Sequence, residues 1–437
     1  MNEITRIHLF REELYQSLEQ RADAGLDLID ALSSATEVES PVVVSQSPLF
    51  RRQFSSVYDF LQHGLLNWWQ LRRLLNRYQP DDAETVCGYE VYAVDCTDDE
   101  HPEADTLPDR GQSRKGRAAS LTIGHRYSWL ARLLKRGTSW CMPQDVTRVA
   151  TDSTDSQVAV EQVKQLDAQS DRLKVVVADS LYGNHIFLSV FLLVTTVFTL
   201  VRLRSNRVLY EDPPPPEDNK RGRPRKHGAK FKLSDPSRPP DRCQIVNLLG
   251  QTIRLQAWHG LHFYKLPALV GLVLRVEFLR ADGQPRYKRP LFLFWTGSTA
   301  VPLLDLAYMY LWRFAIEHMF RFLKQHLGLS TSRSPSLTYN QVWLWSCALA
   351  YAQLVLMRHA VADQRPPWHP RQRQGQPVAM TPRQVQRAAL PFLLELGTPA
   401  QPPQPAGKGT GRPVGFRPEP RKRYSVVKKG RKRPKKR

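Results

Sequence analysis

One stretch constrains the fold of this 437-residue chain more than any other: LLDLAYMYLWRFAIEHMFRFLKQHLG, residues 303–328. It has no internal glycine or proline and ends at a glycine, so it predicts one long helix. At about 100° per residue, four polar side chains fall on one stripe about 60° wide: Tyr310, Arg313, Glu317 and Lys324. Much of the remaining helix surface is apolar, so the helix should be well packed, and its charged side chains then need partners.

The simplest interpretation of the stripe is an ion pair between Arg313 and Glu317, worth a few tenths of a kcal/mol, beside an exposed Lys324. The spacing carries more information: Tyr, two residues, Arg, three residues, Glu, six residues, Lys. It resembles the signature of a large group of bacterial insertion-sequence DDE transposases, in which the Glu is the last catalytic acid. The resemblance therefore implies two upstream aspartates, each at the end of a strand.

Two upstream segments meet this expectation. EVYAVDCT alternates in polarity, is rich in strand-forming residues and delivers Asp95. RLKVVVADSLYGN contains a continuous apolar run, typical of a strand buried on both faces, which ends at Asp179. Taken alone, each aspartate is explained better as a cap or turn residue after a strand. Asp98 and Asp99 also lie close enough to Asp95 to compete for the first position.

Together with the helix, these residues resemble a catalytic triad of Asp95, Asp179 and Glu317. Two carboxylates at strand ends and one on a helix suit a site for two divalent cations about 3.5–4 Å apart. Hard oxygen ligands select Mg²⁺ or Mn²⁺ over zinc. In the family, the Tyr, Arg and Lys of the signature contact DNA phosphates near the cleavage site, which implies that role for Tyr310, Arg313 and Lys324.

The resemblance implies an α/β fold: an RNase H-like, mixed-sheet catalytic core interrupted by a mainly β insertion domain. The separation of 138 residues from Asp179 to Glu317 exceeds what a minimal core needs, and strand-like runs fill much of this interval. The expected parts are a helical N-terminal region (1–80), the first part of the core (81–205), the β-rich insertion (206–300), the helical second part of the core (301–362) and a Pro-rich, largely disordered basic tail (363–437).

Two of these regions leave alternatives open. By the resemblance, the helices of residues 1–80 bind the end of the element, but packing against the core explains them equally well. Residues 186–201 are apolar over a span shorter than the roughly 20 residues that cross a membrane, so a buried helix followed by a strand is expected there.

The charge of the chain is unevenly distributed. Of the net +22, residues 401–437 carry +13 and residues 219–230 carry +6, so the rest is nearly neutral. Such basic runs attract phosphates and release counterions without reading sequence, which indicates double-stranded DNA as the partner. Five cysteines without CxxC spacing favour a reducing cytoplasm, and the charged N-terminus is not a secretory signal.

Two further segments are candidates for DNA contact. KRGRPRK, within the exposed segment 211–240, resembles an AT-hook: Arg221 and Arg223 would enter an A·T minor groove while Gly222 and Pro224 shape the backbone. Purely electrostatic contact is the alternative. In the insertion, family members can stack an aromatic side chain on a flipped base, and Trp258 is the candidate; ordinary core packing is the simpler explanation.

The sequence therefore favours a DNA transposase that cleaves and transfers strands through Asp95, Asp179 and Glu317. The resemblance implies terminal inverted repeats and target DNA as partners, a homodimer on paired ends, and a cytoplasmic, nucleoid-associated location without a membrane partner. Two alternatives remain: an RNase H-like nuclease without strand transfer, and a non-catalytic or domesticated DNA-binding protein.

Overall fold

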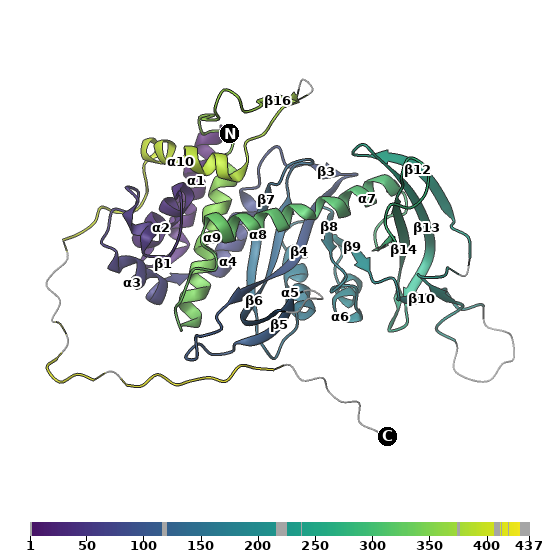
Figure 1. Cartoon of the computed structure of the whole chain (residues 1–437), viewed down its shortest axis with the longest axis horizontal. Coiled ribbons are helices and arrows are strands. Elements are labelled where there is room, and N and C mark those ends of the chain that lie inside the picture. Colours follow the sequence, from purple (N-terminus) through teal and green to yellow (C-terminus); the bar gives the residue numbers. More distant parts are fainter. Residues whose placement is uncertain are drawn as a thin grey trace.

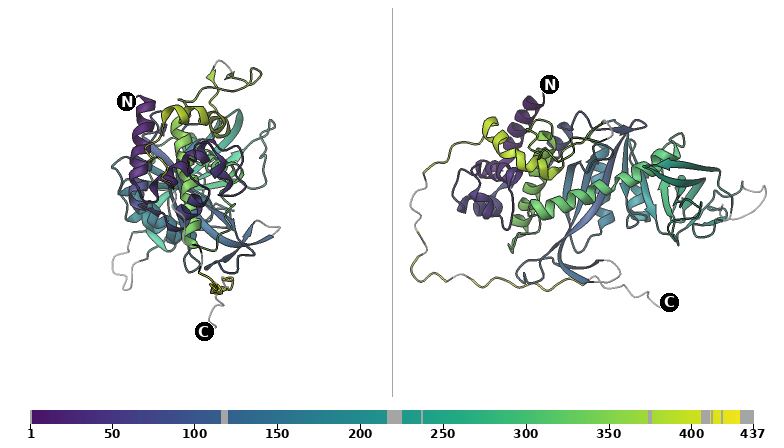
Figure 2. Two further views of the ribbon diagram at one scale, coloured as in Figure 1. Left: turned by 90° about the vertical axis from the view of Figure 1, so that its left-hand side faces the viewer. Right: turned by 45° about the horizontal axis from the view of Figure 1, so that its top comes forward.

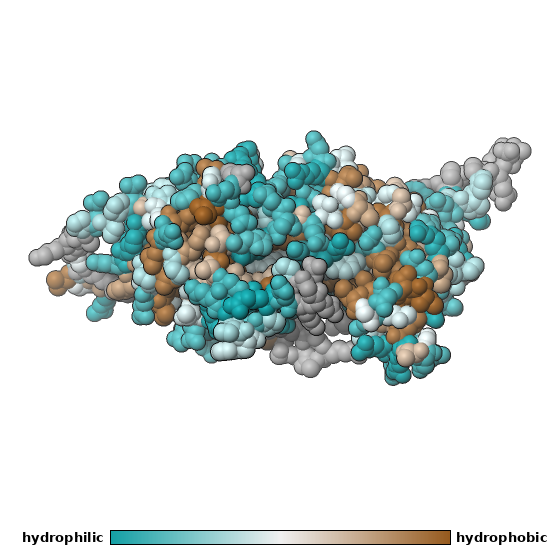
Figure 3. Space-filling model, turned by 90° about the horizontal axis from the view of Figure 1, so that it is seen from above, coloured by the Kyte–Doolittle hydropathy of each residue, from teal (hydrophilic) through white to brown (hydrophobic). Residues whose placement is uncertain are grey.

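The computed structural model describes residues 2–115, 120–215, 225–236, 238–373, 376–405, 411, 413–417 and 419–428. The molecule is elongated, with a helical end, a central sheet and a β-rich end following one another in Figure 1. Seen from above, its surface is largely hydrophilic, and apolar side chains gather toward the two ends (Figure 3).

The helical end is built from both termini of the chain. It contains α1 (Glu3–Gln16), α2 (Ala22–Ser34), the 3₁₀ turn η1 (Val43–Gln46), α3 (Ser55–His63), α4 (Trp68–Arg77), α9 (Leu337–Met357) and α10 (Pro382–Leu396), with the small pair β1 (Leu18–Gln20) and β2 (Leu65–Leu66). Helix α9 is almost wholly buried and contacts α1, α2, α3 and α10. The N-terminal helices are thus packed against the rest of the chain, which is the simpler of the two expectations for them.

The central sheet has the strand order of an RNase H-like core. Strand β4 (Tyr89–Glu100) pairs antiparallel with β6 (Ser120–Leu133), and β6 pairs with β7 (Cys141–Val149). Helix α5 (Asp155–Asp167) then leads to β8 (Lys174–Ala178), which is parallel to β4, and β9 (Val197–Leu203) lies parallel beyond it. The order β7-β6-β4-β8-β9 places β4 in the middle and confirms the predicted α/β fold class. Strands β3 (Thr85–Val86) and β5 (Gly111–Lys115) extend β4 and β6.

The β-rich end continues the same sheet. Its strands are β10 (Val208–Tyr210), β11 (Lys230–Lys232), β12 (Arg242–Leu248), β13 (Gln251–Phe263), β14 (Leu266–Phe278) and β15 (Leu291–Trp295). Antiparallel pairing of β15 with β9 joins them to the core, so the described part of the chain forms one sheet of 13 strands. Residues expected to form a β insertion are therefore strands, and they lie beside the core rather than apart from it.

The single helix predicted within residues 303–328 is two helices, α7 (Leu303–Trp312) and α8 (Phe314–His326). The break is one tightened turn at Arg313: its N–H bonds the Tyr310 carbonyl at 3.2 Å, and its carbonyl accepts from the Ile316 N–H at 3.1 Å. Because the Arg313 backbone stays right-handed helical (φ −46°, ψ −29°), α7 and α8 remain nearly in line across the sheet (Figures 1 and 2).

The apolar segment after Asp179 forms less helix than expected. Helix α6 (His185–Leu188) and the 3₁₀ turn η2 (Ser189–Leu192) are short, and the expected strand β9 follows. Within the described residues, none of the helices has the length and apolar character needed to cross a membrane.

Two hydrophobic cores cover the two faces of the sheet. Val91 and Ala93 of β4 belong to the core that also contains α7, α8 and α9, whereas Tyr92 and Val94 belong to the core formed with α5 and α6. This alternation decides which face each following polar side chain occupies.

Part of the basic tail has defined contacts. Helix α10 packs on α2 and α9, and residues 424–427 bond to β5 and the loop before it. The expectation of disorder in the tail therefore does not extend to these segments.

Candidate active site

Asp95 and Asp179 lie side by side on adjacent parallel strands. In the β4–β8 register Val94 is opposite Ala178, and each aspartate is the next residue. Neighbouring strands are about 4.8 Å apart. Both aspartates continue the alternation of residues that face α7 and α8, such as Ala93. The sheet therefore presents two carboxylates to the helix that carries Glu317.

Arg313 joins this helix to the strand. Its Nη1 donates to Asp95 Oδ2 at 2.8 Å, and its Nη2 donates to Glu317 Oε1 at 2.6 Å. Further along α8, Lys324 Nζ donates to the Asp98 carbonyl at 3.0 Å. Two members of the polar stripe predicted from the sequence, Arg313 and Lys324, thus contact β4. The expected Arg313–Glu317 pair is present, and Asp95 is a second partner of the same guanidinium.

The two aspartates are held in position by backbone donors. The Cys96 N–H donates to Asp95 Oδ1 at 2.8 Å, and the Leu181 N–H donates to Asp179 Oδ1 at 2.8 Å. Burial raises the pKa of Asp95 to about 6; the Arg313 charge opposes this rise, and the Asp179 charge adds to it. A carboxyl group with this pKa changes its charge close to neutral pH.

Tyr310 completes the cluster from α7. Its side chain is buried, its ring lies 5.9 Å from the Arg313 guanidinium carbon, and burial raises the pKa of its hydroxyl group. That hydroxyl also has a hydrogen bond with Arg202, an exposed residue of β9. Sequence analysis did not single out Arg202. Its signal was the basic strand end VRLRSNR, because the parallel pairing of β8 with β9 places Arg202 beside Asp179.

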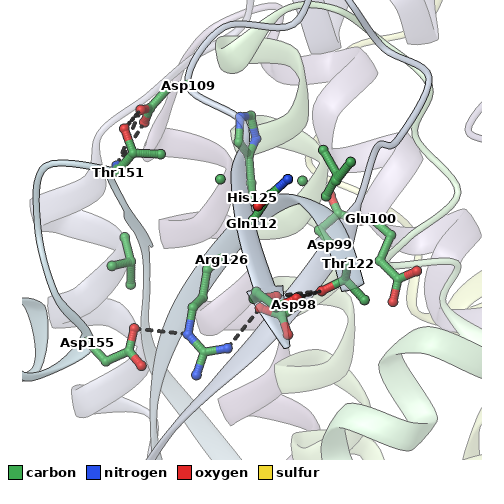
Figure 4. Close-up of a pocket in the computed structure, with 15 residues that line it drawn as sticks. Asp98, Asp99, Glu100, Asp109, Gln112, Thr122, His125, Arg126, Thr151 and Asp155 are labelled. Atoms are coloured by element: carbon green, nitrogen blue, oxygen red, sulfur yellow. Dashed lines mark hydrogen bonds and ion pairs between the residues drawn. The ribbon is translucent and has the colours of Figure 1, made fainter. Parts of the chain in front are cut away.

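The neighbouring acids Asp98 and Asp99 have other partners. Asp98 pairs with Arg126 at 2.8 Å, and Arg126 also binds Asp155 at 2.9 Å, as the dashed lines in Figure 4 show. Asp99 is buried and pairs with His101 at 2.8 Å. Of these three aspartates of β4, Asp95 is therefore the one beside Asp179 and Arg313.

The carboxylate oxygens of the three acids are suitable ligands for a divalent cation, but Arg313 already forms ion pairs with two of the acids. Within the described residues, no group of three or more His, Cys, Asp or Glu side chains is placed to hold a metal ion. Asp95 and Glu317 instead share the Arg313 guanidinium. Carboxylate oxygens suit Mg²⁺ or Mn²⁺, so binding requires Arg313 to release at least one acid.

The remaining predicted DNA contacts lie elsewhere. Arg221, Gly222, Arg223 and Pro224 fall outside the described residues. Trp258 is 1% exposed, packs on Phe231 with ring centroids 5.5 Å apart, and donates its indole N–H to the Arg238 carbonyl at 3.1 Å. In this structure it is a core residue and cannot stack on a base.

An exposed aromatic side chain lies near Trp258 on the same hairpin. Tyr264, in the turn after β13, is 63% exposed and stacks on His227, with centroids 4.7 Å apart. His227 immediately follows the basic segment of the insertion. The sequence signal for an aromatic side chain here was the run HFYK at the end of a strand. This run does not show which of its aromatic side chains is exposed.

Asp179 follows the end of β8 as predicted, whereas Asp95 lies within β4, which continues to Glu100. An RNase H-like sheet with two acids side by side on adjacent strands, covered by a helix that carries a third, defines a nuclease-like core. The comparisons agree: the chain belongs to the DDE superfamily endonuclease family, whose model matches residues 13–262, more than half of the chain. This match includes Asp95 and Asp179 and ends before Glu317. No curated protein matches the chain.

Among solved structures, the chain is similar to the piggyBac transposase in a synaptic complex with hairpin DNA. The TM-score is 0.41 and the sequence identity is 9%, over 89% of this chain and 70% of that one.

Proposed function

We propose that this protein is the DNA transposase of an insertion sequence, of the group with the Tyr-Arg-Glu-Lys signature. It cleaves DNA at the ends of the element and joins these ends to target DNA. The observation that carries the proposal is that Asp95 and Asp179 lie side by side on the RNase H-like sheet, while Arg313 joins Asp95 to Glu317. Membership of the DDE superfamily endonuclease family supports the cleavage step.

Asp95, Asp179 and Glu317 are the residues that would hold two Mg²⁺ or Mn²⁺ ions. When bound, such ions activate the attacking oxygen and stabilise the leaving oxygen. In the absence of ions, Arg313 balances the charge of two carboxylates that burial would otherwise penalise. The Arg313 guanidinium would also suit a DNA phosphate, because its fork geometry fits phosphate as well as carboxylate.

Three further side chains near the acids are proposed to contact DNA: Tyr310 of α7, Arg202 of β9 and Lys324 of α8. Lys324 is bonded to a backbone carbonyl of β4, and Arg202 stands exposed at β9. The basic runs of the insertion and tail add attraction to the duplex that does not depend on sequence. Terminal repeats, target DNA and a homodimer on paired ends are the proposed partners.

The test is Mg²⁺-dependent cleavage of DNA that carries the native flanking ends, comparing wild type with Glu317→Gln. This change keeps the side-chain size and removes the charge that binds a cation. Exposed Glu12 on α1 provides the matched control, Glu12→Gln. We expect the control to nick like wild type, and Glu317→Gln to bind DNA without cutting it. Equal cutting by both variants would exclude Glu317 from the reaction.

A second assay distinguishes a transposase from a nuclease that lacks strand transfer. A pre-cleaved end with a free 3′-hydroxyl should be joined to a target plasmid by wild type. Cleavage without any joined product would favour the nuclease, and DNA binding without cleavage by wild type would favour the non-catalytic protein.

A further inference from the structure

Strand β12 is an outer strand of the large sheet with one unpaired edge. It pairs antiparallel with β13 over all 7 of its residues, and within the described residues it has no other strand partner. Figure 1 shows β12 at the β-rich end of the molecule. An unpaired edge presents a row of backbone N–H and C=O groups that can bind another strand.

The turn between β12 and β13 shows which residues of β12 point outward. Its central residues, Leu249 and Gly250, have φ angles of 51° and 77°, as in a type I′ turn. Such a turn makes Leu248 and Gln251 a hydrogen-bonded pair, and they are opposite each other in the register. Backbone groups alternate in direction along an antiparallel strand. Three residues therefore direct theirs away from β13: Cys243, Ile245 and Asn247.

The pairing of β13 with β14 leads to the same assignment. The Leu279 N–H donates to the Thr252 carbonyl at 2.9 Å, so Thr252 directs its backbone groups toward β14. The next residue, Ile253, then faces β12, where it is opposite Val246. Val246 thus uses its backbone groups on β13, and its neighbour Ile245 directs its own outward.

This outward edge is open in the described part of the chain. The backbone groups of Cys243, Ile245 and Asn247 form no hydrogen bond with any other described segment. Their side chains are also exposed, and Ile245 is 60% exposed. Leu248, on the other face of the strand, is buried in the core that contains α7. Figure 3 shows apolar side chains gathered over this β-rich end.

β12 also lacks the features that usually protect a sheet edge. Elsewhere in the sheet, Val427 forms a bridge with β5, and α4 packs on β7, where Arg72 bonds Asp145 at 2.6 Å. The β12 sequence RCQIVNL contains no lysine or proline, and its pairing with β13 has no bulge. Long, regular edges of this kind favour pairing with another strand.

A second copy of β12 fits this edge in one antiparallel register. With Ile245 opposite Ile245 of the partner subunit, Cys243 is opposite Asn247 of the partner subunit, so every outward residue meets an outward residue. A shift by two residues would leave one outward residue of each copy opposite a position beyond the strand. Arg242 is the only charged residue of β12, and in this register it is opposite Leu248 of the partner subunit. No like charges therefore meet.

We propose that two copies of this chain associate through β12, by antiparallel pairing about a twofold axis at Ile245. A twofold interface uses the same surface on both copies, as this register requires. The inference rests on the proposed function for the role of the homodimer and names the surface that forms it. Strands β13, β14, β15 and β9 separate β12 from β8, so the acids lie about 24 Å along the sheet from the interface and stay open to DNA.

Disulfide trapping of the free protein tests the pairing and its register. Opposite residues in a hydrogen-bonded pair have Cα atoms about 5.5 Å apart, within disulfide range. All variants carry Cys87→Ser, because Cys87 is the other exposed cysteine. We expect Asn247→Cys, which retains Cys243, to form a disulfide-linked dimer on mild oxidation.

The matched control retains Cys243 without the second cysteine. In the proposed register the two copies of Cys243 lie roughly 14 Å apart, so we expect no linked dimer. Ile245→Cys combined with Cys243→Ser should link at the twofold axis. Absence of linkage in both engineered variants, or equal linkage in the control, would overturn the proposal.

Ile245→Pro gives a second readout, measured by sedimentation equilibrium. Proline removes the central outward N–H of each copy, while the hydrogen bonds between β12 and β13 stay complete. Ile245→Val is the matched control, because it keeps the donor and a β-branched side chain. We expect the dimer Kd to rise at least about tenfold for Ile245→Pro and to stay within about threefold for Ile245→Val.

The expected dimer is weak without DNA, because a strand pair of this length buries less than the roughly 1,600 Å² of a standard interface. A wild-type protein that stays monomeric up to about 100 μM would overturn the proposal, as would equal Kd values in all three proteins. Neither assay uses DNA or cleavage, so failure of the proposed catalysis would be seen separately.

Discussion

Arg313→Met tests whether Arg313 balances the charge of the buried acids. The change keeps an unbranched apolar stem and removes every donor. The Arg313 and Asp95 side chains are only 13% and 19% exposed, so their charge-assisted bond should contribute about 1.5–3 kcal/mol. Glu317 is 38% exposed, and solvent screening reduces its bond to below about 1 kcal/mol. We expect a loss of about 2–4 kcal/mol in the free energy of unfolding at pH 8 with EDTA.

A double-mutant cycle with Asp95→Asn separates the pair from general damage. Once Arg313 is replaced, Asp95 is an unpaired carboxylate beside Asp179, so removing its charge should restore stability. We expect a coupling energy of about 2 kcal/mol, measured by urea unfolding. Arg321→Met, an exposed arginine of the same helix, is the control and should change stability by less than about 0.5 kcal/mol.

Mg²⁺ adds a second readout to the cycle. Because Arg313 competes with a cation for two acids, Mg²⁺ should stabilise Arg313→Met more than wild type. A coupling energy below about 0.5 kcal/mol, with equal Mg²⁺ effects on both proteins, would refute the inference that Arg313 balances these carboxylates.

Three further predictions concern the acid, the helical end and the insertion. The folded protein holds the Asp95 proton more tightly than the unfolded chain, since the pKa is about 6 instead of 3.8. With EDTA, wild type should therefore lose about 3 kcal/mol relative to Asp95→Asn as pH rises from about 4 through 6, and parallel pH profiles in urea unfolding would contradict this. Asp30→Asn should cost about 3–5 kcal/mol, because it leaves the buried Arg11 guanidinium without its ion pair; a thermal-shift measurement that finds less than about 1 kcal/mol would contradict the buried pair. Trp258→Ala should destabilise the protein by about 3–5 kcal/mol. Tyr264→Ala should leave stability unchanged and weaken single-stranded DNA binding by about 1–3 kcal/mol, and the opposite pattern would restore Trp258 as the stacking residue.

The strands that carry Asp95 and Asp179 could be predicted from the sequence because their signals are local. The apolar run before Asp179 fixes β8 and its end, whereas the alternation in EVYAVDCT fixes β4 but not its end, which lies five residues beyond Asp95. The helical stripe of Tyr310, Arg313, Glu317 and Lys324 needs only the helix repeat. Parallel strand order then brings the two aspartates together, as an RNase H-like fold requires.

The contacts that could not be predicted from the sequence join residues far apart in the chain or involve backbone groups. Arg313 bonds Asp95 across 218 positions, and nothing local distinguishes that partner from Glu317 four residues away. Residues 424–427 are held at β5 and the loop before it mainly by backbone groups, which leave no side-chain pattern. Trp258 lies within β13 and Tyr264 follows its end, and only the packing of the sheet decides that the tryptophan is buried.

The most direct test of the central claim is nicking of DNA with native flanking ends by Asp179→Asn. Asp179 is outside the Arg313 ion pairs, so its replacement should leave the Arg313 links to Asp95 and Glu317 intact. With Mg²⁺, wild type should nick at the element end. Asp179→Asn should bind the same DNA with equal affinity and give no product above the protein-free background. Nicking by Asp179→Asn at the wild-type rate would contradict an active site built on these three acids.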